Sequence, residues 1–314
     1  MSDVSRPTAV TIGSFDGVHV GHVALIQAAR ARVGPTGRVV AIAFDPHPFA
    51  VLPTKTPPTP LTSFDQRAAL LRQAGADEVV RLEPTRTLLS LHPERFIDLV
   101  LEKFNPVVFV EGEDFRFGRD RFGDIALLKA SGQVLGFDVE VVPGVDVQLT
   151  DQTIVRASST IARWLLAHGR VEDLAAVLGR AFRIQGTVSR GDQRGRTIGF
   201  PTANLAIETS LPADAVYAAT AQLPDGSRFP AAVNIGTRPT VNGTRRRVEA
   251  HILFDGTSPT PEINDYGWWL QLDLHAWIRD QVRFADLDAL AAQLCRDCNR
   301  LRCLYSLVAG GALG

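Results

Sequence analysis

The segment AVTIGSFDGVHVGH, residues 9–22, joins a short apolar run to a glycine-rich loop that leads straight into a predicted helix. Glycines let the backbone of such a loop approach a phosphate closely. The start of the helix adds unpaired N–H groups and the positive end of the helix dipole. His19 and His22 are three residues apart at this helix start, so both side chains can point at the same triphosphate. The segment therefore predicts a strand, loop and helix that bind a nucleotide.

The loop has two alternative interpretations. The zinc motif HExxH needs histidines four apart with a glutamate between them, and this loop has neither, which favours phosphate over metal. The plainer alternative is that Gly13, Gly17 and Gly21 only make a turn and that the histidines pack. For the motif taken by itself, this alternative stays open.

The first half of the chain alternates two kinds of segment. Near-continuous runs of Val, Ile, Ala and Phe are typical of strands buried on both faces, and amphipathic segments between them predict helices. Such repeats indicate a parallel sheet with right-handed crossovers, a Rossmann-like α/β domain. The strands are expected at Ala9–Ile12, Val39–Phe44 and Val107–Val110, and the helices at Val23–Arg32, Phe64–Ala74 and Glu94–Phe104.

Beyond about Arg183 the apolar pattern changes to a period of two, as in the alternation from Leu270 to Ile278. Alternation with frequent Gly, Pro, Asn and Asp turns favours a small antiparallel barrel or sandwich. Further strands are expected at Arg183–Val188, Val216–Leu223, Ala231–Ile235 and Val248–Leu253, and a last helix at Leu287–Leu307.

The segment Ser158–Leu178 predicts two helices broken at Gly169 that join the halves. A length of 314 residues suggests about two domains. We expect a first domain over 1–180 and a second over 181–314.

Composition limits the possible partners. A formal net charge of -1 argues against a nucleic-acid-binding protein, because duplex binding relies on clustered Lys and Arg. No apolar run approaches the roughly 18 residues that span a bilayer, and the N-terminal MSDVSRPT lacks the features of a secretory signal. We expect a cytoplasmic protein of unknown oligomeric state that handles phosphate on a small ligand.

Three cysteines, Cys295, Cys298 and Cys303, lie close together in the predicted last helix. A metal site would need a fourth ligand, and no second CxxC is present. We expect packed or surface thiols and no disulfide framework.

Three further polar motifs fall where open parallel sheets bind ligands, beyond the carboxyl ends of strands or at a helix start. They are FDPHP (Phe44–Pro48), EGEDFRFG (Glu111–Gly118) and SSTIAR (Ser158–Arg163). Ser158 and Ser159 could simply cap the helix. Arg163 is expected in the first turn, where the dipole disfavours a cation, and is harder to explain without an anion.

Together the four motifs resemble the nucleotidyltransferase superfamily, and more narrowly the FMN adenylyltransferase half of bacterial bifunctional riboflavin kinase/FAD synthetases. The family pattern GxFDGxHxGH, FDPHP, GxDFxFG and SSTxxR is met in order over about 160 residues. The resemblance implies adenylyl transfer from ATP to FMN, with His19, His22, Arg163 and Mg²⁺ neutralising the leaving pyrophosphate.

The resemblance also assigns binding residues. Nucleotide contacts are expected from Gly13, Phe15, Asp16, Gly17, Gly21, Ser158, Ser159 and Thr160, and flavin contacts from Asp45, His47, Asp114, Phe115 and Phe117.

The second half contains GTVSRGDQRGRTIGFPTANL, Gly186–Leu205. Its glycines are spaced like a flexible loop that covers phosphates, and PTAN (Pro201–Asn204) offers a hydroxyl and an amide that could coordinate Mg²⁺ with a nucleotide. A turn started by proline is the plainer alternative for PTAN alone. The expected nucleotide contacts here are Gly191, Gly195, Arg196 and Gly199.

PTAN is followed in order by NIGTRPT (234–240), VEAHIL (248–253), DYG (265–267) and WIRDQVRF (277–284), which resembles the riboflavin kinase domain. That domain implies a six-stranded barrel of Greek-key type with a C-terminal helix. In VEAHIL, Glu249 shares a face with His251, opposite Val248 and Ala250. The resemblance makes Glu249 the catalytic base and lets Thr202 and Asn204 hold Mg²⁺ and ATP; an exposed strand carboxylate is the alternative.

The chain departs from the family pattern at Ala215, where Gly is usual, at Ala162, where a branched residue is common, and in a longer loop over Phe254–Asp265. None of these changes affects a residue assigned to chemistry. The expected function is therefore phosphorylation of riboflavin to FMN followed by adenylylation to FAD. An enzyme with one working site, and a flavin carrier without catalysis, are the competing hypotheses.

Overall fold

The computed structural model describes residues 6–52, 56–190, 199–240, 243–254 and 266–309. Contacts divide the chain into two compact units, Met1–Ala162 and Arg163–Gly314. The expected domain boundary near residue 180 stays a prediction.

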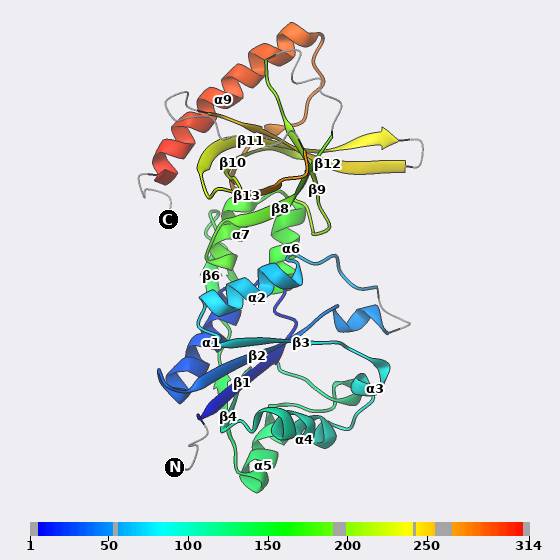
Figure 1. Cartoon of the computed structure of the whole chain (residues 1–314), viewed down its shortest axis with the longest axis vertical. Coiled ribbons are helices and arrows are strands. Elements are labelled where there is room, and N and C mark those ends of the chain that lie inside the picture. The colour runs from blue at the N-terminus through cyan, green and yellow to red at the C-terminus, as the bar shows by residue number, and fades with distance from the viewer. Residues whose placement is uncertain (1–5, 53–55, 191–198, 241–242, 255–265, 310–314) are drawn as a thin grey trace. The chain divides into compact units, whose positions relative to one another are not determined.

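The first unit is built on a five-stranded parallel sheet in the order β3-β2-β1-β4-β5 (Figure 1). The strands are β1 (Thr8–Gly13), β2 (Arg38–Phe44), β3 (Glu78–Leu82), β4 (Val108–Gly112) and β5 (Asp138–Val142). The predicted parallel sheet is confirmed, and the three predicted strands are β1, β2 and β4. The two edge strands β3 and β5 were not predicted, because they are only partly buried and mix charged residues with valine.

Helices connect the strands of this sheet. The three predicted helices are α1, α2 and α4, with bounds within three residues of those expected. A small two-stranded sheet of β6 and β7 follows β5. The remaining elements are short turns of helix or, in α5, a helix that was not predicted. The bounds are α1 (Val20–Val33), η1 (Pro48–Ala50), α2 (Phe64–Gln73), α3 (Arg86–Leu89), α4 (Pro93–Phe104), η2 (Arg119–Arg121), α5 (Ile125–Leu135), β6 (Asp146–Gln148) and β7 (Ile154–Arg156).

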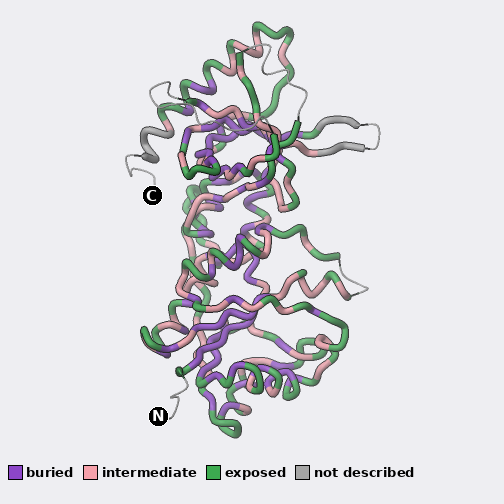
Figure 2. Tube along the Cα trace, viewed as in Figure 1, coloured by how far each residue is buried: buried purple, intermediate pink, exposed green. Residues whose placement is uncertain are grey.

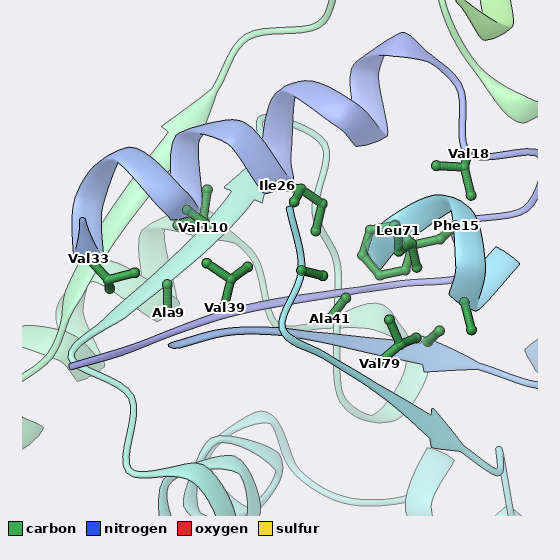
Figure 3. Packing of buried hydrophobic residues seen from close by; sticks show 14 of the residues in the cluster. Ala9, Phe15, Val18, Ile26, Val33, Val39, Ala41, Leu71, Val79 and Val110 are labelled. Atoms are coloured by element: carbon green, nitrogen blue, oxygen red, sulfur yellow. The ribbon is translucent and has the colours of Figure 1, made fainter. Parts of the chain in front are cut away.

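The sheet of the first unit is covered on both faces. Alternate residues of β1 and β2 point to opposite sides: Ala9, Val39 and Ala41 pack with the helices α1 and α2, as Figure 3 shows for Ile26, Val33 and Leu71. Val10 and Val40 pack on the other side with the helices α4 and α5. The central strands are therefore the most buried part of this unit (Figure 2).

Two short helices follow, α6 (Ser159–Ala167) and α7 (Val171–Leu178). The predicted break is confirmed, since Gly169 lies between them with φ of +69°, a left-handed conformation that glycine adopts without strain.

The second unit contains a closed six-stranded barrel in the order β10-β11-β12-β9-β8-β13. All its neighbours are antiparallel, and closure leaves no sheet edge. The predicted barrel and C-terminal helix are thus confirmed. The bounds are β8 (Phe182–Ser189), β9 (Ala203–Ala206), β10 (Ala215–Gln222), β11 (Arg228–Thr240), β12 (Gly243–Ile252), β13 (Trp269–Asp280) and α9 (Leu287–Ala309).

The alternation predicted for β13 is interrupted at Asp273, and Ala276 is only partly buried. Leu270, Leu272 and Leu274 are buried as expected, but Asp273 is buried as well. Its carboxylate accepts hydrogen bonds from Arg183 at 2.6 and 2.8 Å and from Arg228 at 3.2 Å. These charged partners compensate the carboxylate for its loss of water.

The cysteines of α9 are free thiols: Cys298 is buried, and Cys295 and Cys303 are exposed. Burial raises the pKa of the Cys298 thiol.

Candidate active sites

A pocket of about 350 Å³ opens in the first unit beside the ends of β1 and β4. Strands β2 and β3 lie on one side of β1, and strands β4 and β5 lie on its other side. The strand order therefore changes direction at this point of the sheet. Such a switch point is where open parallel sheets bind ligands. Eight of the predicted site residues line the pocket: Gly13, Phe15, His19, Gly21, His22, Asp114, Phe115 and Ser158.

The two histidines of the glycine-rich loop lie together at this pocket. Helix α1 starts at Val20, so His19 is its N-cap residue and His22 lies in its first turn. The two rings stack with centroids 3.6 Å apart and planes inclined by 24°. A Cβ at position 21 would lie 3.1 Å from the His19 ring, so a larger residue here would require the ring to move by a few tenths of an ångström.

The backbone between strand and helix is strained. Gly17 has φ of 80°, which suits glycine, but Phe15 and Val18 also have positive φ, of 48° and 43°. A branched residue rarely adopts this conformation, and surrounding contacts must hold it.

Asp16 supplies much of that support. Its buried carboxylate accepts hydrogen bonds from the backbone of Leu61, at 3.0 Å, and of Thr62, at 3.1 Å. The hydroxyl of Thr62 in turn accepts one from the backbone of Gly17 at 3.1 Å. Asp16 and Gly17 were predicted to bind nucleotide, but these contacts fit support of the loop.

The serines at the start of α6 have different partners. Ser158 accepts a hydrogen bond from the backbone of Ile161 at 3.2 Å, which is the capping role weighed above. Ser159 donates to the backbone oxygen of Asp16 at 2.7 Å and so ties this helix to the glycine-rich loop. Thr160 is exposed.

The expectation that Arg163 lies in the first turn of this helix was wrong. Helix α6 begins at Ser159, so Arg163 is its fifth residue, one place beyond the first turn, and it belongs to the second unit. The helix dipole is a weaker argument at that position, because its effect falls off within one turn.

The predicted flavin residues divide into two groups. Asp114 and Phe115 line the pocket. Asp45, His47 and Phe117 are not among the described residues that line it. Asp45 forms ion pairs with Arg67 at 3.3 Å and Arg81 at 3.6 Å.

The other two residues outside the pocket have structural contacts. His47 accepts a hydrogen bond from the backbone of Phe49 at 3.1 Å. Phe117 is buried in the core cluster beside α4.

Arg67 is a residue that the sequence analysis missed. It is 4% exposed and donates from one nitrogen to the backbone oxygens of Ser14, at 2.7 Å, and Phe44, at 2.8 Å. It therefore links the glycine-rich loop to the FDPHP motif, and burial lowers its pKa. A signal was available, because Arg67 falls on the buried face of α2 with Ala68 and Leu71.

Glu111 was also missed. Its side chain is buried at the pocket, and its Oε1 atom accepts a hydrogen bond from the backbone of Ile12 at 2.8 Å. Strand β1 pairs with β4 at Ala9 and Val108 and at Val10 and Phe109. In the same register Glu111 lies beside Ile12, so its carboxyl reaches the Ile12 N–H. Burial raises the pKa of Glu111 well above its usual value.

In the second unit, the ladder between β9 and β12 places Asn204 directly opposite Glu249 and Ala203 opposite Ala250. Cross-strand partners point to the same side of a sheet. Glu249 and Asn204 are half-buried, while Val248 and Ala250 are buried on the other side. The face predicted for Glu249 therefore carries Asn204 as well.

Thr202 is exposed two residues before Asn204. Its hydroxyl, the Asn204 amide and the Glu249 carboxylate form a set of oxygen donors, which is the chemistry that Mg²⁺ prefers. Among the described residues, no group of three His, Cys, Asp or Glu side chains could hold a metal ion.

The predicted nucleotide loop falls only in part on described residues. Gly191, Gly195 and Arg196 lie outside the described residues, as do residues 255–265 of the longer loop. Gly199 is exposed, with φ of 83°.

Comparison with known proteins gives consistent matches over both units. Residues 1–158 match the family model described as FAD synthetase, and residues 178–305 match the model described as riboflavin kinase. A protein of Escherichia coli (strain K12) named bifunctional riboflavin kinase/FMN adenylyltransferase is 38% identical over 294 residues, which are 92% of this chain and 90% of that protein. The protein of the same name from Haemophilus influenzae is 32% identical and covers 96% of each chain.

A solved structure from Streptococcus pneumoniae, titled a macrolide-efflux protein, superposes with a TM-score of 0.83 at 28% identity, covering 94% of each chain. None of the helices in the part of the chain that the structure describes is long and apolar enough to cross a membrane.

Proposed function

The chain belongs to the family of bifunctional riboflavin kinase/FMN adenylyltransferases, and we propose that it runs the two reactions of this family at two separate sites. The second unit phosphorylates riboflavin with ATP to give FMN and ADP. The first unit transfers an adenylyl group from ATP to FMN, which gives FAD and pyrophosphate. Both reactions use ATP as co-substrate, and both act on small molecules, which fits a role in the cytoplasm.

In the adenylyl transfer, a phosphate oxygen of FMN attacks the α-phosphorus of ATP, and the bond to the β-phosphate breaks. The attacking phosphate is already ionised, so the reaction needs little help from a base. It needs positive charge near the leaving pyrophosphate. We assign this role to His19 and His22, which stack at the pocket, with Asp114 and Phe115 on the flavin side.

In the kinase reaction, the terminal hydroxyl of riboflavin attacks the γ-phosphorus of ATP, and the bond to ADP breaks. The hydroxyl must lose its proton as the new bond forms. We propose that the carboxylate of Glu249, which lies on the same face as Asn204, accepts this proton. Thr202 and Asn204 would hold a magnesium ion, which when bound neutralises charge on the phosphates.

The observation that carries this proposal is the pairing of Asn204 with Glu249 across β9 and β12, because it joins the proposed metal site and the proposed base on one face. Phosphorus labels can test the two reactions directly. Label from the γ-phosphate of ATP should enter FMN and remain in FAD, while label from the α-phosphate should enter FAD alone. Label from the α-phosphate in FMN, or none from the γ-phosphate, would contradict the assignment.

A further inference from the structure

His251 makes a contact that the proposed kinase reaction does not use. It lies two residues after Glu249 in β12, and its Nδ1 atom is 2.8 Å from the backbone oxygen of Pro201. A carbonyl oxygen can only accept a hydrogen bond, so Nδ1 carries the proton and donates. Pro201 is the first residue of PTAN, so the histidine reaches the segment that bears the proposed magnesium ligands.

The ladder between β9 and β12 ends close to this contact. Its recorded pairs are Leu205 with Val248, Asn204 with Glu249 and Ala203 with Ala250. The next position in this register would set Thr202 opposite His251. Strand β9 starts at Ala203, so the side chain of His251 holds the chain where the ladder stops.

Thr202 is consequently fixed from both sides. Ala203, which follows it, is paired in the ladder, and the backbone oxygen of Pro201, which precedes it, accepts the hydrogen bond from His251. Thr202 itself is exposed. A residue between two anchored neighbours has fewer backbone conformations to lose when it binds a ligand.

The imidazole ring is itself held in place. Phe200 meets it edge to face, with centroids 5.2 Å apart and planes at 61°. Phe200 in turn packs against the apolar cluster that contains Leu253 and Leu301. The donor of the hydrogen bond therefore has a defined position relative to the barrel.

We propose that His251 is a positioning residue of the kinase site, which holds Pro201 so that the Thr202 hydroxyl is set in advance to receive magnesium and ATP. This inference rests on the proposed kinase function of the second unit. His251 touches neither the transferred phosphate nor the flavin in this account. Its loss should therefore affect the binding of Mg²⁺ and ATP more than the binding of riboflavin.

The test compares two variants of the full chain. His251→Leu removes the donor at similar size, and His251→Asn keeps an N–H group near the place of Nδ1. Riboflavin phosphorylation is measured against MgATP at saturating riboflavin and against riboflavin at saturating MgATP. FAD formation from supplied FMN, measured in the same preparation, reports whether the first unit is folded, and the KM for riboflavin reports whether the kinase barrel is intact.

For His251→Leu we expect the KM for MgATP to rise about 5-fold or more, with less than about a 2-fold change in the KM for riboflavin, consistent with the loss of about 1 kcal/mol for one hydrogen bond. His251→Asn should recover most of this loss. An unchanged KM for MgATP in His251→Leu, an equal rise for both substrates, or an Asn variant no better than the Leu variant would overturn the inference. Absence of FMN formation by the unaltered chain would instead contradict the proposed function.

Discussion

Asn204 of β9 and Glu249 of β12 are directly opposite each other in the barrel of the second unit. The two residues are 45 positions apart in the chain, and their pairing brings together the motifs PTAN and VEAHIL. Because cross-strand partners share a face, an amide oxygen and a carboxylate point to the same side of this sheet. This relationship is the basis of the proposed kinase site, in which Asn204 would help to hold Mg²⁺ and Glu249 would accept the proton of the riboflavin hydroxyl.

Glu249→Gln should abolish most FMN formation while leaving FAD formation from supplied FMN unchanged. The amide keeps the shape of the side chain but cannot accept the proton of the riboflavin hydroxyl, and a positioned base typically contributes about 100-fold or more to the rate. Separate chromatographic assays of the two products measure this. Glu208→Gln, at an exposed position of the same unit, serves as the control, and loss of both activities in Glu249→Gln would argue against two sites.

His22→Ala should have the opposite pattern. Removal of one group that stabilises charge in the transition state costs about 100-fold or more, so FAD formation should fall steeply while FMN formation continues. His92→Ala, an exposed histidine of the same unit, should leave both rates within about 2-fold, as is usual for surface changes. Equal damage to both activities by His22→Ala would contradict the assignment of the adenylyl transfer to the first unit.

Glu111 should make the stability of the chain depend on pH. Its pKa is raised in the folded state, so between the usual value of 4.5 and the raised value the folded chain binds a proton that the unfolded chain has released. The free energy of unfolding therefore falls as pH rises through this window, by up to about 1.4 kcal/mol for each pH unit. Below the window, the stabilisation that the bound proton provides is fully present.

Glu111→Gln keeps an acceptor for the backbone N–H of Ile12 and carries no charge. Its stability relative to the unaltered chain should therefore increase as pH is raised from about 5 to about 8. Denaturant unfolding at several pH values measures the difference. Glu102→Gln, an exposed glutamate in α4, should show no such trend, and a constant difference for Glu111→Gln would mean that Glu111 does not titrate in this range.

Asp16→Ala should destabilise the first unit and reduce FAD formation together. The change leaves the backbone N–H groups of Leu61 and Thr62 without the carboxylate that they meet now, and each buried donor left without a partner costs about 1–3 kcal/mol. Thermal unfolding and the FAD assay measure the two effects. Asp65→Ala, an exposed position in α2, is the control; normal FAD formation by Asp16→Ala would show that the strained loop does not need this support.

The central strands could be predicted because burial on both faces leaves a continuous apolar run, as in β1 and β2. The edge strand β5 lacks that signature, because all its residues are at least partly exposed. Strand β9 has only four residues and begins two positions after Pro201. Its local sequence fits a turn equally well, and only pairing with β12 makes it a strand.

Within the candidate sites, spacing sufficed for residues that act through local geometry. His19 and His22 could be expected to meet, because they are three residues apart at a helix start, and they do. Contacts between distant segments could not be expected in this way. Arg67 meets Ser14 and Phe44 through tertiary structure, and nothing local distinguishes the core residue Phe117 from Phe115, which faces the pocket.

A time course of the purified chain with riboflavin, ATP and Mg²⁺ tests the central claim most directly, with FMN and FAD separated by chromatography. We expect FMN to appear first and FAD to follow at its expense, because FMN is the product of the proposed kinase reaction and the substrate of the proposed adenylyl transfer. FMN without FAD would contradict a working adenylyltransferase in the first unit. If neither product formed, the account of two catalytic sites would be wrong.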